Sequence, residues 1–541
     1  MSNRFLVVFD TPSIKQYVFG TDVLREIRGA SANLDELNRV KTRSRISSIL
    51  KNAEICEVYA NGGSAQFIIQ GVSADEVRQA CREVAVLYMN ETAGDVIPVY
   101  GIAPLLEEQH YRTAVQAAQT ELRSRREMTF GHRVCWAMPI ATECSSASHL
   151  PASGLYQIGG DAPLALSHSS HRKAERGRSA REHGMWFEWM QYLANMGGWP
   201  HKDDWDKLRC DTLDEIGDFS EGRVSGYIGL IYADGNAMGQ VVRDLPSPDV
   251  CRAFSQLVDG SIRSACFHAL TESCTQEIEQ IRRTGQNARC RLPADILLLG
   301  GDDLLVVLPA DRSLAFATRV AQEFENITGQ KIGQLNGTAK EFFAKLGRMR
   351  MSISVGVAIA RGNYPFYLLL DLAEELLKNA KKYSRSDSAI EARVDFHVVA
   401  GANSFSLHHV RRDDYFCNSS THSGDSCPRT LRPLSLAQME KLRDSVDTLR
   451  RVNFPRSKLH TLYEASLSPS VTLAMRTIRE VFVRCKTVPS QNERLAIWDA
   501  LQNCCPSGWS FNSETFPFYQ RGGERLLAIA DIVEAYDLWG K

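Results

Sequence analysis

The sequence has no hydrophobic run long enough to cross a membrane and no excess of either charge. No apolar stretch approaches the ~20 residues that span a bilayer. The 63 Lys and Arg residues nearly balance the 64 Asp and Glu residues, for a formal net charge of -1, so no overall basic field attracts nucleic acid. The N-terminal segment also lacks a cleavable signal pattern. We therefore expect a cytoplasmic protein without membrane contact, in which any nucleic-acid contact is local.

The sequence also lacks a regular cysteine framework. Its 14 cysteines are scattered, many within apolar or helical patterns, which is typical of reduced thiols in a cytosolic protein. Cys135, Cys144 and His149 are candidate zinc ligands. The Cys-x8-Cys gap, however, lacks the short Cys-x2-Cys pair of structural zinc sites, and a fourth ligand is not evident. A metal-free segment is the favoured interpretation, and a degenerate zinc-binding region is the alternative.

One order of predicted elements occurs twice in the chain. A length of 541 residues allows three or four domains. Residues 1–110 and 221–402 each read as strand, helix, hairpin, helix and strand, the order of a ferredoxin-like unit. A linker domain is predicted at 111–220 and a helical domain at 403–541. The predicted class is α+β, with two palm domains of the nucleotidyl cyclase and GGDEF type.

The most informative motif is Gly-Gly-Asp-Asp at residues 300–303. The apolar runs at 296–299 and 304–308 are too short for buried helices and predict the two strands of a hairpin. The glycines make the turn and leave room for a phosphate beside the backbone. The carboxylates of Asp302 and Asp303 repel each other unless a cation lies between them. Oxygen ligands suit Mg²⁺ or Mn²⁺, which in turn hold nucleotide phosphates.

A third acid, Asp234, follows the predicted strand at 227–232, beside the hairpin. Three carboxylates from neighbouring strand ends suit a two-metal site for phosphoryl transfer, so Asp234, Asp302 and Asp303 are predicted as catalytic and metal-binding residues. The glycines after Asp234 let backbone amides approach phosphate. Lys381 is placed either to reach a triphosphate or simply to suit its helix dipole. The nucleotide-binding residues predicted in this copy are Gly235, Asn236, Gly239, Gly300, Gly301 and Lys381.

The first copy keeps the glycine turn but not the acids. Ser64 and Ala65 follow Gly62 and Gly63, and Asp10 is the acid at the end of the first strand. One carboxylate cannot hold two metal ions, so this copy is predicted to be catalytically silent. Gly62, Gly63 and Ser64 are predicted to bind nucleotide, with a hairpin kept only for packing as the alternative.

These motifs together resemble the polymerase (large) subunit of type III CRISPR effector complexes, which has two palm domains. The segments that carry the resemblance are residues 9–19 and 26–31 in the first copy and 231–239, 300–303, 354–356 and 380–381 in the second. The resemblance implies conversion of ATP to cyclic oligoadenylates, which are antiviral second messengers. It implies that Asp234, Asp302 and Asp303 bind the metal and that one nucleotide lies near Gly62.

The sequence departs from this family in three ways. It contains no His-Asp dipeptide, so we do not expect an HD nuclease domain. The family's zinc-binding cysteine pairs are reduced to Cys135 and Cys144. The chain is also short, which leaves open a freestanding monomer or homodimer as well as a subunit that binds guide-RNA complex partners or target RNA. A basic run at 171–181 could contact RNA, although such runs are more often solvated.

Two further functions stay open. A diguanylate cyclase-like or other cyclic-nucleotide synthase is disfavoured, because the segment after Asp234 lacks the Phe-Lys and Asn-Asp pattern of that family's guanine site. That family's hairpin also usually ends in Glu-Phe or Asp-Phe. A non-catalytic nucleotide-binding subunit is disfavoured because an idle site has no need of a costly carboxylate cluster.

Overall fold

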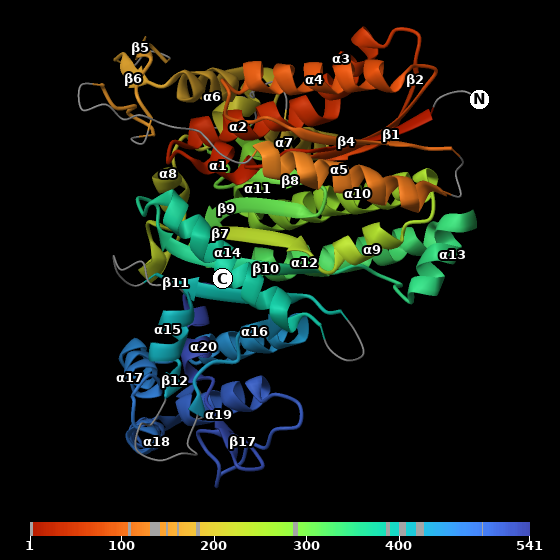
Figure 1. Cartoon of the computed structure of the whole chain (residues 1–541). Coiled ribbons are helices and arrows are strands. Elements are labelled where there is room, and N and C mark those ends of the chain that lie inside the picture. The colour runs from red at the N-terminus through yellow and green to blue at the C-terminus, as the bar shows by residue number, and fades with distance from the viewer. Residues whose placement is uncertain are drawn as a thin grey trace.

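The computed structural model places two sheets and a helical region one after another along the molecule (Figure 1). No helix in the described segments combines the length and apolarity needed to cross a bilayer. The structure describes residues 4–106, 110–129, 141–147, 150–158, 162–179, 184–284, 290–385, 390–399, 407–417, 427–488 and 491–540.

The first sheet has the strands β1 (Arg4–Asp10), β2 (Glu54–Asn61), β3 (Ser64–Gln70) and β4 (Val99–Pro104). Its helical elements are α1 (Ile14–Phe19), α2 (Leu24–Glu36), the π-helical turn η1 (Leu37–Lys41), α3 (Thr42–Ile49), α4 (Ala74–Glu91) and α5 (Tyr111–Thr129). The strands are antiparallel in the order β2-β3-β1-β4. That order confirms the ferredoxin-like unit. Because side chains alternate along β1, Val7 packs in the core with α4 and Leu6 in the core with α5.

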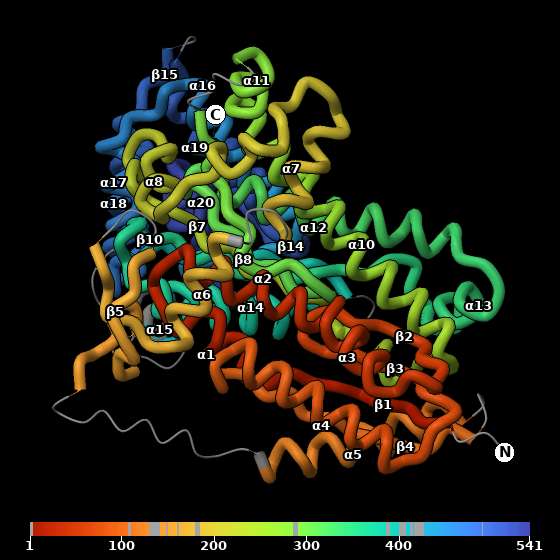
Figure 2. Tube along the Cα trace, turned by 90° about the horizontal axis from the view of Figure 1, so that it is seen from above, coloured from red at the N-terminus to blue at the C-terminus, as the bar shows by residue number. Residues whose placement is uncertain are grey.

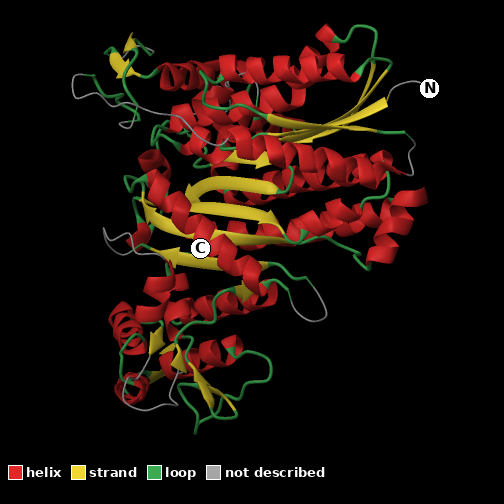
Figure 3. Cartoon of the chain, in the orientation of Figure 1, coloured by secondary structure: helices red, strands yellow, loops and turns green. Residues whose placement is uncertain are grey.

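The second sheet repeats this arrangement and extends it. Its strands are β7 (Tyr227–Gly235), β8 (Asp295–Gly300), β9 (Asp303–Pro309), β10 (Ile353–Arg361), β11 (Arg393–Val398) and β14 (Leu434–Ser435). The order is β14-β11-β10-β7-β9-β8. Its last four strands have the order of the first sheet, whereas β11 pairs in parallel with β10 and β14 adds an edge. Figure 3 shows both sheets between their helices.

Helices cover both faces of the second sheet. They are α9 (Met238–Asp244), α10 (Pro248–Ser273), α11 (Thr275–Thr284), α12 (Ala310–Gln334), α13 (Gly337–Leu346) and α14 (Phe366–Tyr383). The chain breaks at Cys274 between α10 and α11. The Ser273 and Thr275 hydroxyls donate to carbonyls of the preceding turn, a contact that commonly bends helices.

The connection between the sheets contains β5 (Gly154–Tyr156), β6 (Leu164–Leu166), α6 (His168–Ser179), α7 (Met185–Asn195), η3 (Lys202–Leu208), α8 (Leu213–Gly217) and η4 (Gly222–Val224). In the basic run at 171–181, Lys173 and Arg176 pack on the first unit, Arg178 is exposed, and residues 180 and 181 lie outside the described residues. Lys173 is buried and donates to the Tyr17 carbonyl at 2.6 Å, and Arg176 pairs with Glu91 at 2.6 Å. Figure 2 shows α6 beside α2.

The C-terminal region is mainly helical, as predicted. Its helices are α15 (Leu407–Asp414), α16 (Leu436–Arg451), α17 (Arg456–Ser466), α18 (Val471–Val483), α19 (Glu493–Cys504) and α20 (Ile529–Tyr536). Its short strands are β12 (Phe416–Cys417), β13 (Cys427–Pro428), β15 (Thr487–Val488), β16 (Gln491–Asn492), β17 (Tyr519–Arg521) and β18 (Glu524–Leu526).

Candidate functional site

The two glycine turns, distant in sequence, face each other in space. A Cβ atom added to Gly62 would lie 3.5 Å from the Gly300 carbonyl oxygen and 3.6 Å from the Gly301 Cα. Gly62 and Gly301 both have positive φ, at 56° and 66°, which glycine adopts without strain. The β2–β3 turn and the β8–β9 turn therefore meet tip to tip.

The three predicted acids lie on the second-sheet side of this contact. The pairing of β7 with β9 reaches Ala233 opposite Leu304, so Asp234 and Asp303 follow at adjacent strand ends. The Asp302 and Asp234 carboxyl groups are close enough to interact electrostatically. Lys381, from the last turn of α14, forms an ion pair with Asp234.

Crowding of like charges changes the protonation of these acids. Burial and the neighbouring Asp234 carboxylate raise the pKa of Asp302 to about 7. Burial, followed by the charges of Asp234 and Asp302, raises the pKa of Asp303 well above its ordinary value, while Lys15 and Lys381 act to lower it. The two acids of the turn thus favour the protonated form, and a bound cation would stabilise their ionised form.

The acids fit a divalent cation by their chemistry. Among the described residues, no set of three or more His, Cys, Asp or Glu side chains converges as a ready-made metal cage. The donors are nevertheless carboxylate oxygens, which Mg²⁺ and Mn²⁺ prefer. Lys381 already offers one positive charge to Asp234. These residues are candidate ligands for a cation brought in with nucleotide phosphates.

Three cavities surround the acids. One of about 550 Å³ is bordered by Asp234, Gly235, Asp302 and Lys381. A second, of about 180 Å³, lies between Asp302, Ser64 and the apolar side of α10. A third, of about 160 Å³, lies on the other side of the turn, between Gly63 and Asp303. The site therefore has one larger polar cavity and two smaller cavities around the two glycine turns.

The remaining predicted nucleotide-binding residues are placed differently. Gly239 lines the large cavity, and a Cβ atom there would meet nothing within 4 Å. The Asn236 side chain is 3 % exposed. It donates to the Ser352 hydroxyl at 3.0 Å and accepts from the Ser354 hydroxyl at 2.8 Å. Its amide thus ties β7 to β10, and its backbone borders the cavity.

Of the three candidate zinc ligands, only Cys144 lies in the described part of the chain. Cys135 and His149 are outside the described residues. Cys144 is buried, and its sulfur accepts from the Ser167 backbone N–H at 3.2 Å. The choice between a zinc site and a metal-free segment stays a prediction.

Sequence reasoning missed three charged residues near the turns. Lys15 of α1 lies with its ammonium 4.8 Å from the centre of the Tyr232 ring and 2.8 Å from Glu374. Asp259 of α10 accepts a hydrogen bond from the Gly301 N–H at 3.0 Å, and Arg39 binds Asp259. These contacts join distant segments, so no local motif signals them.

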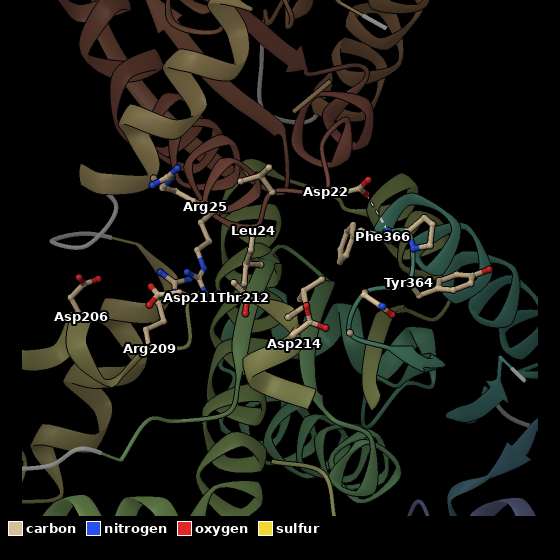
Figure 4. Close-up of a pocket in the computed structure, with 17 residues that line it drawn as sticks. Asp22, Leu24, Arg25, Asp206, Arg209, Asp211, Thr212, Asp214, Tyr364 and Phe366 are labelled. Carbon is tan, nitrogen blue, oxygen red and sulfur yellow. Dashed lines mark hydrogen bonds between the residues drawn. The ribbon is translucent and has the colours of Figure 1, made fainter. Parts of the chain in front are cut away.

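A further cavity, of about 700 Å³, lies elsewhere and shares no lining residue with the three at the acids. It lies between α2, α8 and the start of α14 (Figure 4). Asp22 accepts from the Phe366 N–H at 3.1 Å there. Cationic and acidic side chains both line it, so its charge favours no class of ligand.

Comparison with known proteins gives one family match. Residues 227–390 match the family model described as Cas10/Cmr2, second palm domain. No curated protein sequence matches the chain.

Solved structures match over most of the chain at low identity. A Csm1-Csm4 cassette in complex with cA4 has a TM-score of 0.54 and 15% identity, covering 93% of this chain and 69% of that one. The cassette with cA3 has a TM-score of 0.51 at 15% identity, covering 99% and 70%. Csm1 in T. onnurineus has a TM-score of 0.50 at 15% identity, covering 89% and 64%. Residues 227–390 are thus similar to the second palm domain of Cas10/Cmr2, and the chain as a whole has a fold like that of the Csm1 structures.

Proposed function

We propose that this protein is a nucleotidyltransferase that converts ATP to cyclic oligoadenylates as part of CRISPR-type antiviral defence. The observation that carries the proposal is that Asp234, Asp302 and Lys381 border one polar cavity of about 550 Å³, with Lys381 paired to Asp234. Clustered carboxylates and a lysine at a cavity edge suit a polyphosphate that arrives with its cation.

The cavities suggest how two nucleotides would lie. In our proposal the polar cavity takes a triphosphate, with Lys381 as a point charge and the backbone after Asp234 free to approach phosphate oxygens. The narrower spaces, bordered by Ser64 and Gly63 of the first unit, take parts of the two nucleotides. The first unit then binds without catalysing, as its single strand-end acid, Asp10, predicts.

In the proposed reaction, a ribose hydroxyl oxygen of one ATP bonds to the α-phosphorus of another. The bond from that phosphorus to pyrophosphate breaks, and the hydroxyl proton passes to solvent. Asp234, Asp302 and Asp303 would hold Mg²⁺ or Mn²⁺, which supplies charge neutralisation and lowers the pKa of the attacking hydroxyl. The chain itself positions the reacting groups and places Lys381 where phosphate charge gathers.

We also propose that the protein works with other subunits of a guide-RNA complex. The similar proteins include Csm1 in Csm1-Csm4 cassettes with cA4 and cA3. A reaction that needs added RNA or partner subunits would support this assembly, whereas full activity of the isolated chain would favour a freestanding monomer or homodimer.

Mass analysis of products tests the nucleotide and the chemistry together. The protein is incubated with Mg²⁺ and either ATP or GTP, with and without RNA. We expect oligoadenylates from ATP and pyrophosphate release in step with them. A product made only from GTP, as a cyclic dimer, would favour the diguanylate cyclase alternative. Tight ATP binding without any pyrophosphate would favour the non-catalytic subunit.

A further inference from the structure

A single π-helical turn contacts both glycine turns of the site. The turn η1 follows α2 directly and carries Asn38 and Arg39 in succession. Such wide turns are rare within helices and often occur at functional sites. Here the altered turn sends two consecutive side chains to two different hairpins.

Asn38 holds the turn of the first unit. With its amide oriented so that both polar atoms are satisfied, the Asn38 side-chain oxygen accepts from the Asn61 N–H at 3.3 Å and the Gly63 N–H at 3.2 Å. The turn that faces Gly301 is therefore fixed from within its own unit.

Arg39 reaches the turn of the second unit through one carboxylate. Its guanidinium binds Asp259 of α10 in bidentate fashion, at 2.8 Å and 3.4 Å. The same Asp259 oxygen that takes the shorter bond accepts from the Gly301 N–H at 3.0 Å. Asp35 fixes Arg39 from the other side at 2.7 Å.

A second arginine completes the arrangement. Arg263 lies 3.2 Å from Asp259 and donates to the Leu299 carbonyl at 3.1 Å. Burial acts to raise the pKa of Asp259, but Arg263 and Arg39 outweigh it and hold the pKa below its ordinary value. Asp259 thus stays ionised, and its charge-assisted hydrogen bonds are stronger than neutral ones.

We propose that Arg39 and Asp259 are positioning residues that hold the two glycine turns in register and thereby fix Asp302 and Asp303 for catalysis. The inference rests on the proposed function, because the acids need this placement only if they react. Neither residue borders the large polar cavity, so triphosphate binding there does not depend on them. We call the Arg39–Asp259 pair the clamp. Its loss should therefore lower kcat more than it raises KM.

The first test measures the turn itself, without reference to catalysis. Amide hydrogen exchange at Gly301 is compared between wild type, Asp259→Ala, Arg39→Lys and the control Asp249→Asn, an exposed change on the same helix. Loss of the acceptor should speed exchange at Gly301 about tenfold or more in Asp259→Ala. The control should match wild type.

The second test measures product formation over a range of ATP concentrations at saturating Mg²⁺. Arg39→Lys keeps the charge but loses the bidentate geometry, so kcat should fall about tenfold with KM changed less than about threefold. Asp249→Asn should leave both unchanged. If Asp259→Ala fails to fold, Arg39→Lys carries both tests.

The outcomes separate the clamp from the function. If Arg39→Lys has the same Gly301 exchange and the same kcat as the control, the proposed role of the clamp is wrong. A kcat that falls only with the folded fraction, with Gly301 exchange unchanged, would reduce it to a stabilising contact. If wild type makes no product but Gly301 exchange is faster in Asp259→Ala than in wild type, the proposed function fails. The Arg39–Asp259 pair then only holds the turns together.

Discussion

The acids of the candidate site are not equivalent. Asp234 forms an ion pair with Lys381. The pKa values of Asp302 and Asp303 are instead raised by burial and by neighbouring carboxylates. A carboxyl group whose pKa is near 7 keeps its proton in much of the protein at neutral pH, until a bound cation displaces that proton. Proton release and metal binding should therefore be linked at this turn.

Asp302 should make the metal-free protein less stable as the pH rises. Its pKa is 3.8 when unperturbed and about 7 in the fold, so between these values the unfolded chain has lost a proton that the folded protein keeps. The penalty begins above the lower value and is complete above the upper one. Asp302→Asn removes it, so the variant's Tm advantage should grow by a few degrees between pH 5 and 8. An advantage independent of pH would contradict the raised pKa.

Gly235 is placed where a side chain would displace a candidate ligand. A Cβ atom there would lie 2.6 Å from an Asp302 carboxylate oxygen, closer than such atoms approach. Gly235→Ala should therefore lower product formation by about tenfold or more while the protein stays folded. Gly333→Ala, in open space on α12, is the matched control. Wild-type activity in Gly235→Ala would show that the turn tolerates a shifted Asp302.

At the scale of elements, the two units share a packing device. Gly101 on β4 lies against α5, and Gly356 on β10 lies against α14. Added Cβ atoms would come within 1.8 Å of the Ala118 carbonyl oxygen and 2.4 Å of the Ala373 carbonyl oxygen. In each unit the fourth strand thus uses glycine to bring the next helix close, and in the second unit that helix carries Lys381.

Gly356→Ala should push α14 away from the sheet. Overpacking against backbone costs about 1–3 kcal/mol or more, and the displaced helix moves Lys381 from Asp234. Denaturant unfolding should show that loss, and product formation should fall beyond the loss of folded protein. Gly333→Ala again serves as control, and equal stability of the two variants would contradict the packing argument.

Local sequence patterns predicted the strands and turns that position the acids. They could not predict contacts between segments that are distant in sequence. The hairpin at 295–309 was predictable because two short apolar runs flank a glycine turn, and Asp234 because it ends an apolar strand. The π-helical turn and the Arg39–Asp259 pair join segments 220 residues apart, for which one sequence holds no signal. The packing of Lys173 was not predictable, because charge alone does not reveal that this residue of the basic run is buried. The domain limits stay a prediction.

At the scale of the whole molecule, one core joins the two sheets. Residues of the first unit such as Ile27 share a core with Leu297 and Leu305 of the second. Within this contact Asp295, fully buried on β8, binds Arg28 of α2 at 2.6 Å and Arg209 of the connection at 2.5 Å. Three segments of the chain thus meet on one carboxylate.

Asp295→Asn should destabilise the assembly of the two units. It leaves two buried guanidinium groups without their counter-charge, and breaking a buried ion pair costs about 3–5 kcal/mol. Urea unfolding followed by fluorescence should show a lower midpoint. A double variant that also changes Arg209 to Met should recover part of the loss. An unchanged midpoint in Asp295→Asn would show that the network adds nothing.

The most direct measurement is mass analysis of the products formed by the protein from ATP and Mg²⁺, with and without added RNA. Wild type should yield cyclic oligoadenylates and pyrophosphate. The variant carrying Asp302→Asn and Asp303→Asn should yield neither, while its circular dichroism spectrum matches wild type. Continued pyrophosphate release by that folded variant would contradict the assignment of these acids to catalysis.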